Sequence, residues 1–259
     1  MYDYTTLDVK STQGVLHVVL NRPDVYNAFN EQVVEELTEC FTRIPQDESY
    51  CVVLTGNGRY FCAGADLVWM QKVASYTREE NIKDSKKMAL MFDAIDKCPK
   101  PVVGRINGSA FGGGVGLVAV CDYVVCSENA QFAFSEVNLG IVPAVISTYV
   151  LPKIGISHGR ALFLSGERFT ASNALAMGLV HTVCPAEELD TVCEEKVKVL
   201  QSSGPKAMAA AKEMIRKWSA VPREDYADYT TELIASLRAS EEGKEGISAF
   251  LEKRRPVWR

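Results

Sequence analysis

Two short segments rich in glycine and alanine could expose backbone N–H groups to a ligand. Residues 63–65 read Ala-Gly-Ala and precede Asp66, which begins an apolar stretch, and residues 112–114 are three glycines that open another. Small residues let a ligand touch the backbone, and N–H groups at a helix start can polarise a carbonyl oxygen. The pair therefore predicts an oxyanion-binding site. The alternatives are close helix packing for the glycines and a helix N-cap for Asp66.

Glu136 lies between apolar stretches, where a solvated glutamate is not the usual residue. A carboxylate in an apolar pocket has a raised pKa and makes a useful general base. The alternative is a residue at a helix start whose carboxylate accepts hydrogen bonds from backbone N–H groups.

Two familiar motifs are matched only superficially. The three glycines do not continue as the dinucleotide-binding GxGxxG pattern, because its last position is Leu117. Residues 155–159 match the GxSxG pattern of serine hydrolases around Ser157, but Pro152 and Lys153 precede them instead of a buried strand. We therefore interpret these glycines as a helix junction, not as the turn around a nucleophile.

Alternating strands and helices must position the candidate groups. Periodicity predicts strands within 4–10, 15–20, 51–55, 102–106, 123–126 and 131–134, and helices over 30–44 and 82–98. Asn30 is the expected N-cap of the first helix. After residue 135 the pattern is helical, apart from 178–184. This order predicts an α/β core followed by a helical C-terminal part, with a candidate hinge at Gly204-Pro205.

Composition narrows the class of protein. The 259 residues are 47% hydrophobic and 24% charged with a net charge of −5, which excludes a disordered chain and a small disulfide scaffold. The acidic balance disfavours a nucleic-acid partner, although the run at 253–255 is basic. Eight cysteines without CxxC spacing and only three histidines predict free thiols and no metal site. With no signal peptide or membrane span visible, we expect a soluble, cytoplasmic protein.

Five segments together resemble the crotonase superfamily, also called the enoyl-CoA hydratase/isomerase family. They are Arg22-Pro23 with Asn27-Ala28, and the stretches at 61–67, 107–117, 132–143 and 164–180. The resemblance runs from about Leu7 to the C-terminus. It implies a ββα spiral core, here residues 1–204, and a C-terminal helical region, residues 205–259, that builds a trimer or a dimer of trimers.

The resemblance also implies roles for individual residues. The substrate would be an acyl thioester of CoA or a carrier protein, with no further cofactor and no metal. The backbone N–H groups of Ala63 and Gly113 would hold the thioester oxygen, and Glu136 would be the catalytic base. The residues expected along CoA and the substrate are Arg22, Ala28, Ala65, Asp66, Leu67 and Gly112.

One departure from the family pattern bears on the reaction. Hydratases of this family usually carry a second glutamate, and that position is Gly116 here. The segment 143–147 also lacks the usual run of glycines. We expect Gly116 to leave room for a bulky acyl chain. Trp69, Met70 and Tyr149 are expected pocket residues, and Lys72 and Arg78 are candidate partners for a distal carboxylate.

The stretches around 111–122 and 135–150 are similar to bacterial methylglutaconyl-CoA and carboxygeranoyl-CoA hydratases. This similarity implies a lyase that hydrates a branched or carboxylated enoyl-CoA. A single carboxylate also suits a double-bond isomerase, a dehydratase, or a decarboxylase acting on a carrier-bound acyl group. A thioester-binding paralogue without catalysis is the non-enzyme alternative.

Overall fold

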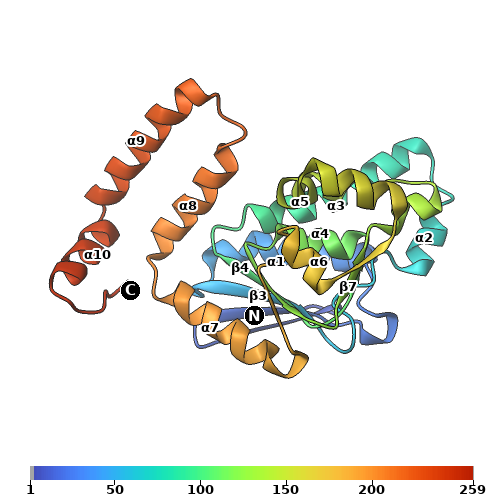
Figure 1. Ribbon diagram of the computed structural model, residues 1–259, viewed down its shortest axis with the longest axis horizontal. Coiled ribbons are helices and arrows are strands. Elements are labelled where there is room, and N and C mark those ends of the chain that lie inside the picture. Colours follow the sequence, from blue (N-terminus) through green and yellow to red (C-terminus); the bar gives the residue numbers. More distant parts are fainter. Residues whose placement is uncertain (1–2, 259) are drawn as a thin grey trace.

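The computed structural model describes residues 3–258 and contains a six-stranded, mainly parallel sheet (Figure 1). Only the first strand pair is antiparallel. The strands in spatial order are β1 (Leu7–Thr12), β2 (Val15–Leu20), β3 (Cys51–Gly56), β4 (Val102–Ile106), β6 (Tyr123–Ser127) and β9 (Thr182–Cys184). A second, three-stranded sheet has the order β5 (Ala110–Phe111), β7 (Gln131–Ala133) and β8 (Arg168–Thr170).

Helices cover both faces of the larger sheet, which explains the continuous apolar run of β3. Because side chains alternate along a strand, Val52 and Leu54 join the main core, whereas Cys51 and Val53 join a smaller cluster on the opposite face. That smaller cluster packs against α7 (Leu189–Gln201). The main core is built with α1 (Glu31–Arg43), α3 (Arg78–Asp96), α4 (Gly113–Val120) and α5 (Ala144–Ser165).

Two predicted helix caps are present. Asn30 Oδ1 accepts a hydrogen bond from the Val33 N–H at 2.9 Å and starts α1. Asp66 Oδ1 accepts from the Val68 N–H at 2.8 Å and starts α2 (Leu67–Val73). Each cap satisfies an N–H group that has no acceptor inside its helix.

The GxSxG pattern lies inside α5 and not after a strand. Gly155 has a φ of +72° and kinks this helix, and Ser157 continues it on the far side of the kink. A nucleophile of the hydrolase type needs a sharp turn from strand to helix. The interpretation as a helix junction is therefore confirmed.

Three short strands, β5, β8 and β9, were not predicted as strands. Each is only two or three residues long and is defined by its pairing, β5 and β8 with β7 and β9 with β6, and not by a local pattern. The remaining short helices are α6 (Ala171–Ala176) and four 3₁₀ turns at Pro23–Val25, Ile44–Gln46, Ser135–Leu139 and Ala186–Glu188.

Three helices at the C-terminal end extend away from the core (Figure 1). They are α8 (Pro205–Lys217), α9 (Arg223–Ala239) and α10 (Glu241–Leu251). Large apolar side chains remain at their surface, including Trp218, Phe250 and Leu251, which are 67%, 82% and 74% exposed. Within residues 3–258, no helix combines the length and apolarity needed to span a membrane.

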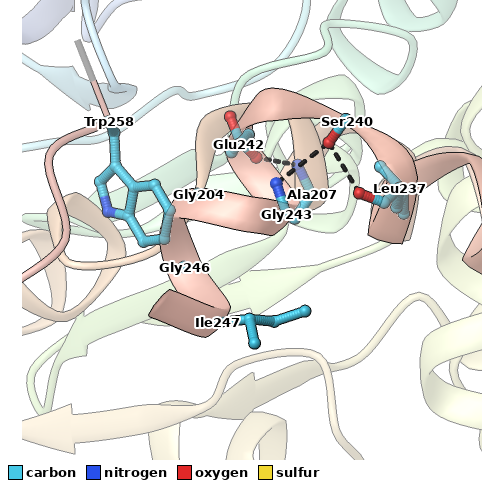
Figure 2. Close-up of a pocket in the computed structure, with 9 residues that line it drawn as sticks. All are labelled: Gly204, Ala207, Leu237, Ser240, Glu242, Gly243, Gly246, Ile247 and Trp258. Atoms are coloured by element: carbon cyan, nitrogen blue, oxygen red, sulfur yellow. Dashed lines mark hydrogen bonds between the residues drawn. The ribbon is translucent and has the colours of Figure 1, made fainter. Parts of the chain in front are cut away.

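Hydrogen bonds join α10 to the start of α8 (Figure 2). The Glu242 carboxylate accepts from the Lys206 and Ala207 N–H groups at 3.0 and 2.8 Å, where α8 leaves N–H groups without intrahelical acceptors. Ser240 caps α10 by accepting from the Gly243 N–H at 3.0 Å. A cavity of about 200 Å³ lies at this junction, and none of its lining residues belongs to the candidate site.

Candidate active site

The two small-residue loops lie side by side. The Phe111 N–H donates to the Cys62 carbonyl at 3.0 Å, and Cys62 and Ala110 form a parallel bridge. Gly64 has a φ of +93°, and a Cβ at this position would lie 2.8 Å from the Phe111 carbonyl oxygen. Glycine is therefore required at position 64 for both the backbone conformation and the approach of the second loop.

The backbone hydrogen bonds change one expected oxyanion donor. The Ala63 N–H donates to the Tyr26 carbonyl at 3.0 Å, so it is used within the fold and is not available to a ligand. Neither the Ala65 N–H nor the Gly113 N–H has an acceptor among residues 3–258. Ala65 is exposed, and Gly113 is the first residue of α4. The Ala63 N–H is therefore not free to hold a thioester oxygen, contrary to expectation, whereas the Ala65 N–H in the same loop is free among the described residues.

Glu136 lies in the 3₁₀ turn after β7, with its carboxylate against the second loop. A Cβ at Gly112 would be 3.1 Å from Glu136 Oε1. The other carboxylate oxygen, Oε2, is buried and has no hydrogen-bond partner within residues 3–258. Burial raises the pKa of Glu136, and a hydrogen bond from its own backbone N–H opposes this increase. Its own N–H is thus the one backbone donor that contributes, and Oε2 is left without a donor among residues 3–258. A buried carboxylate oxygen without a partner makes Glu136 a strong candidate base.

Gly112→Ala should inactivate the protein by moving this carboxylate. Gly112 has a φ of +50°, so alanine would cost about 1–3 kcal/mol in backbone strain, and its Cβ would press on Oε1. A misplacement of about 1 Å can cost about 10²-fold in rate. The control is Gly155→Ala, which also has a positive φ but no atom within 4 Å of the added Cβ. Both variants are assayed at a temperature at which each is folded. Equal turnover rates of the two variants would contradict this role of Gly112.

The residues expected along CoA are partly engaged with one another. Arg22 Nη2 pairs with Asp66 Oδ2 at 2.9 Å, and Arg22 Nη1 donates to the Ala28 carbonyl at 2.6 Å. The first contact ties the loop at 22–28 to the start of α2, and the second closes the loop on itself. Ala28 and Asp66 are buried, whereas Leu67 is 81% exposed and the adjacent Val68 is 76% exposed. Leu67 is thus open to a ligand, and Arg22 and Asp66 shape the loops around it.

The space at Gly116 is already filled. A Cβ there would lie 2.3 Å from Ile146 Cγ2 and 2.9 Å from the Phe92 ring. The expectation that Gly116 makes room for a bulky acyl chain is therefore wrong, because α5 packs against α4 at this point. Ile146 and Phe92 were not singled out in the sequence. Ile146 could have been identified from the sequence by its position, because it lies in the segment where the resemblance implies a run of glycines.

The other expected pocket residues differ in their surroundings. Trp69 is 6% exposed, and the Tyr149 ring lies 5.8 Å from the Phe92 ring. Met70 is half-buried. Lys72 pairs with Glu31, whereas Arg78 is exposed at the start of α3.

Comparisons with known proteins agree on a family. The sequence profile described as enoyl-CoA hydratase/isomerase matches residues 10–259. The chain is similar to the 2,3-dehydroadipyl-CoA hydratase of Escherichia coli, with 34% identity over 96% of this chain and 97% of the relative. It is also similar to the trans-2-decenoyl-[acyl-carrier-protein] isomerase of Streptococcus mutans, with 30% identity over 98% of this chain and 98% of the relative. A crystal structure of an enoyl-CoA hydratase from Shewanella pealeana superimposes with a TM-score of 0.94 at 37% identity, covering 98% and 96% of the two chains.

Proposed function

The chain belongs to the enoyl-CoA hydratase/isomerase (crotonase) family, and on that premise we propose that it hydrates a branched or carboxylated enoyl-CoA with Glu136 as its acid–base residue. The observation that carries the proposal is the buried Oε2 of Glu136, which has no partner in the described part of the chain and lies beside the glycine loop that starts α4. The crotonase fold and the enzyme family predicted from the sequence are confirmed.

The proposed mechanism needs one carboxylate and two N–H donors. The Ala65 and Gly113 N–H groups bind the thioester oxygen and stabilise the negative charge that develops there. Ionised Glu136 takes a proton from water while the water oxygen bonds to the β-carbon. The electron pair of the double bond moves to the thioester enolate. Glu136 then gives the same proton to the α-carbon, so one water is added and the carboxylate is restored.

One observation supports a carboxylated acyl group. The Escherichia coli relative is named for a carboxylated enoyl-CoA. Of the two cations considered for a distal carboxylate, Lys72 is paired with Glu31, and Arg78 is exposed on α3. We therefore assign Arg78 as the candidate partner of the distal carboxylate. Because the space over Gly116 is filled, any branch of the acyl chain lies elsewhere.

A second function, double-bond isomerisation, is favoured by the absence of a carboxylate at position 116. One base that removes a proton from one carbon and returns it to another completes an isomerisation without activating water. The Streptococcus mutans relative is named as an isomerase of a carrier-bound enoyl thioester.

Incubation in heavy water separates the two reactions. We expect 2-enoyl-CoAs, including 3-methylglutaconyl-CoA and crotonyl-CoA, to gain the mass of one D₂O, because hydration adds both deuterium and oxygen. An isomerase would move the double bond of a 3-enoyl-CoA without gaining oxygen. Saturated butyryl-CoA is the control for simple exchange, and products are followed by mass spectrometry. Absence of both products from the CoA thioesters and from a carrier-bound enoyl thioester would refute the proposed family of reactions.

The uncovered apolar residues of α8 to α10 support assembly of several copies. Side chains as large as Trp218 and Phe250 are rarely left in water on an extended arm. We propose a homotrimer or a dimer of trimers as the form in which this surface is buried.

A further inference from the structure

Trp69 carries a buried polar atom without a partner. Its side chain is 6% exposed, and the indole Nε1 has no hydrogen-bond acceptor within residues 3–258. An indole N–H can only donate, and a buried donor without an acceptor is unfavourable. Most buried polar groups in proteins are hydrogen-bonded, so this N–H indicates an acceptor that the described part of the chain does not provide.

Asp84 is the neighbour of this indole on α3. It is half-buried, on the same side of the helix as the half-buried Asn81 and Met88. Burial is the main cause that raises the pKa of Asp84, and the Trp69 side chain is among the groups that oppose the increase. The two side chains are therefore close together, yet no hydrogen bond of ordinary length joins Trp69 Nε1 to a residue within 3–258.

The lysines whose charges act on Asp84 have other partners. Lys72 pairs with Glu31, and Lys87 pairs with Glu35 at 2.8 Å. Asp84 forms no ion pair of its own among the described residues. Its carboxylate can therefore accept a hydrogen bond from a ligand.

The helices that carry these two side chains flank the proposed oxyanion donors. Trp69 lies on α2, which begins two residues after Ala65. Met88 lies one helical turn after Asp84 on α3, and its Cε would be 3.8 Å from a Cβ on Gly113. Ala65 and Gly113 supply the two N–H groups proposed to bind the thioester oxygen. The pair thus comes from the two elements that border this oxygen site.

Asp84 lies on the substrate side of Gly113. Met88 faces Gly113 at the start of α4, whereas Phe92 faces Gly116 farther along, so the two helices run antiparallel. Asp84 precedes Met88 by one turn and therefore lies beyond the N-terminal end of α4. The N–H groups at a helix start point toward that end, where the thioester oxygen is proposed to bind.

A hydroxyl group would satisfy both partners at once. The indole can only donate, an ionised carboxylate can only accept, and a hydroxyl does both. Hydration of an enoyl thioester creates a hydroxyl on the β-carbon, two carbons from the thioester oxygen. We propose that Trp69 and Asp84 form a subsite for the β-hydroxyl of the 3-hydroxyacyl-CoA product and for the water from which it comes. This inference rests on the proposed function, because an isomerase would form no such hydroxyl.

Binding of acyl-CoAs with and without the hydroxyl tests the subsite. Affinities for both enantiomers of 3-hydroxybutyryl-CoA and for butyryl-CoA are measured by calorimetry in the Glu136→Gln protein, which should not consume them. Asp84→Ala should weaken binding of one hydroxyl enantiomer about 10–100-fold, since the lost bond is to a charged group, and Trp69→Phe about 2–10-fold. The affinity for butyryl-CoA should be nearly unchanged.

Two further variants serve as references. Asp84→Asn keeps an acceptor oxygen and should lose less affinity for the hydroxylated ligand than Asp84→Ala. Glu79→Ala removes an exposed acidic residue from the same helix and should change neither affinity. If Trp69→Phe fails to fold, the comparison of Asp84→Ala with Asp84→Asn decides alone.

The outcomes separate the subsite from the proposed function. Equal losses for butyryl-CoA and 3-hydroxybutyryl-CoA, or no loss for either, would overturn the subsite, because a purely structural role affects both ligands alike. A loss confined to 4-hydroxybutyryl-CoA would overturn the assignment to the β-hydroxyl. Dehydration of 3-hydroxybutyryl-CoA by the Glu136→Gln protein would instead refute the proposed base, and the inference with it.

Discussion

Glu136→Gln is expected to lower kcat by about 10²–10⁴-fold, the usual contribution of a positioned acid–base group. Glutamine keeps the size of the side chain but can neither accept the proton of water nor deliver it to the α-carbon. The affinity for a saturated acyl-CoA should change little, because binding the thioester uses backbone N–H groups and the CoA loops. Steady-state kinetics and calorimetry with butyryl-CoA measure the two effects separately.

The same substitution should stabilise the fold at neutral pH. Oε2 is buried without a partner among residues 3–258, and ionising a carboxylate there is unfavourable, which is why the pKa is raised. At pH values above the folded pKa of Glu136, removing the charge should therefore raise the unfolding midpoint. At lower pH, where the wild-type carboxylate is protonated, this advantage should disappear.

Glu167→Gln is the matched control, because Glu167 is exposed and lies in a turn before β8. It should alter neither kcat nor the unfolding midpoint. If Glu136→Gln retained wild-type turnover, or if Glu167→Gln lost as much, Glu136 would not be the base.

The second large effect is expected for Gly113→Pro, which removes one proposed oxyanion donor. Gly113 is the first residue of α4, a position where proline is well tolerated, so the helix should still form. The loss of a single donor typically lowers kcat by about 10²–10³-fold, because charge develops on the thioester oxygen in the transition state.

Gly113→Ala separates the lost N–H from the added Cβ. Both variants place a Cβ about 2.9 Å from the Phe29 ring, so both require that ring to move. Only proline removes the donor. We expect kcat of the proline variant to fall well below that of the alanine variant, with both unfolding midpoints recorded. Equal kcat in the two variants would show that the Gly113 N–H does not bind the reacting oxygen.

Local features of the fold and the site could be predicted from the sequence because each depends on neighbouring residues. A side chain such as that of Asn30 or Asp66 reaches an N–H group two or three residues away, so both caps could be identified from the residues alone. The candidacy of Glu136 followed from the apolar residues on either side of it. The strands of the larger sheet other than β9, and the order of the elements, followed from periodicity, and the family resemblance supplied the fold.

Contacts between distant segments could not be predicted. The Ala63 N–H donates to the Tyr26 carbonyl, and only the fold of the segment between them, which includes α1 and β3, brings that carbonyl to it. Residue 116 is glycine in the sequence, but whether the space beside it is open depends on how α5 packs against α4.

The base, the two small-residue loops and the helix caps can thus be identified from the order of residues alone. Which N–H groups remain free, and which side chain fills the space at Gly116, follows only from the folded arrangement. The difference lies in the distance along the chain over which each feature is satisfied. Caps and periodicity are satisfied within a few residues of chain, whereas hydrogen-bond acceptors and packing partners are set by segments that become neighbours only on folding.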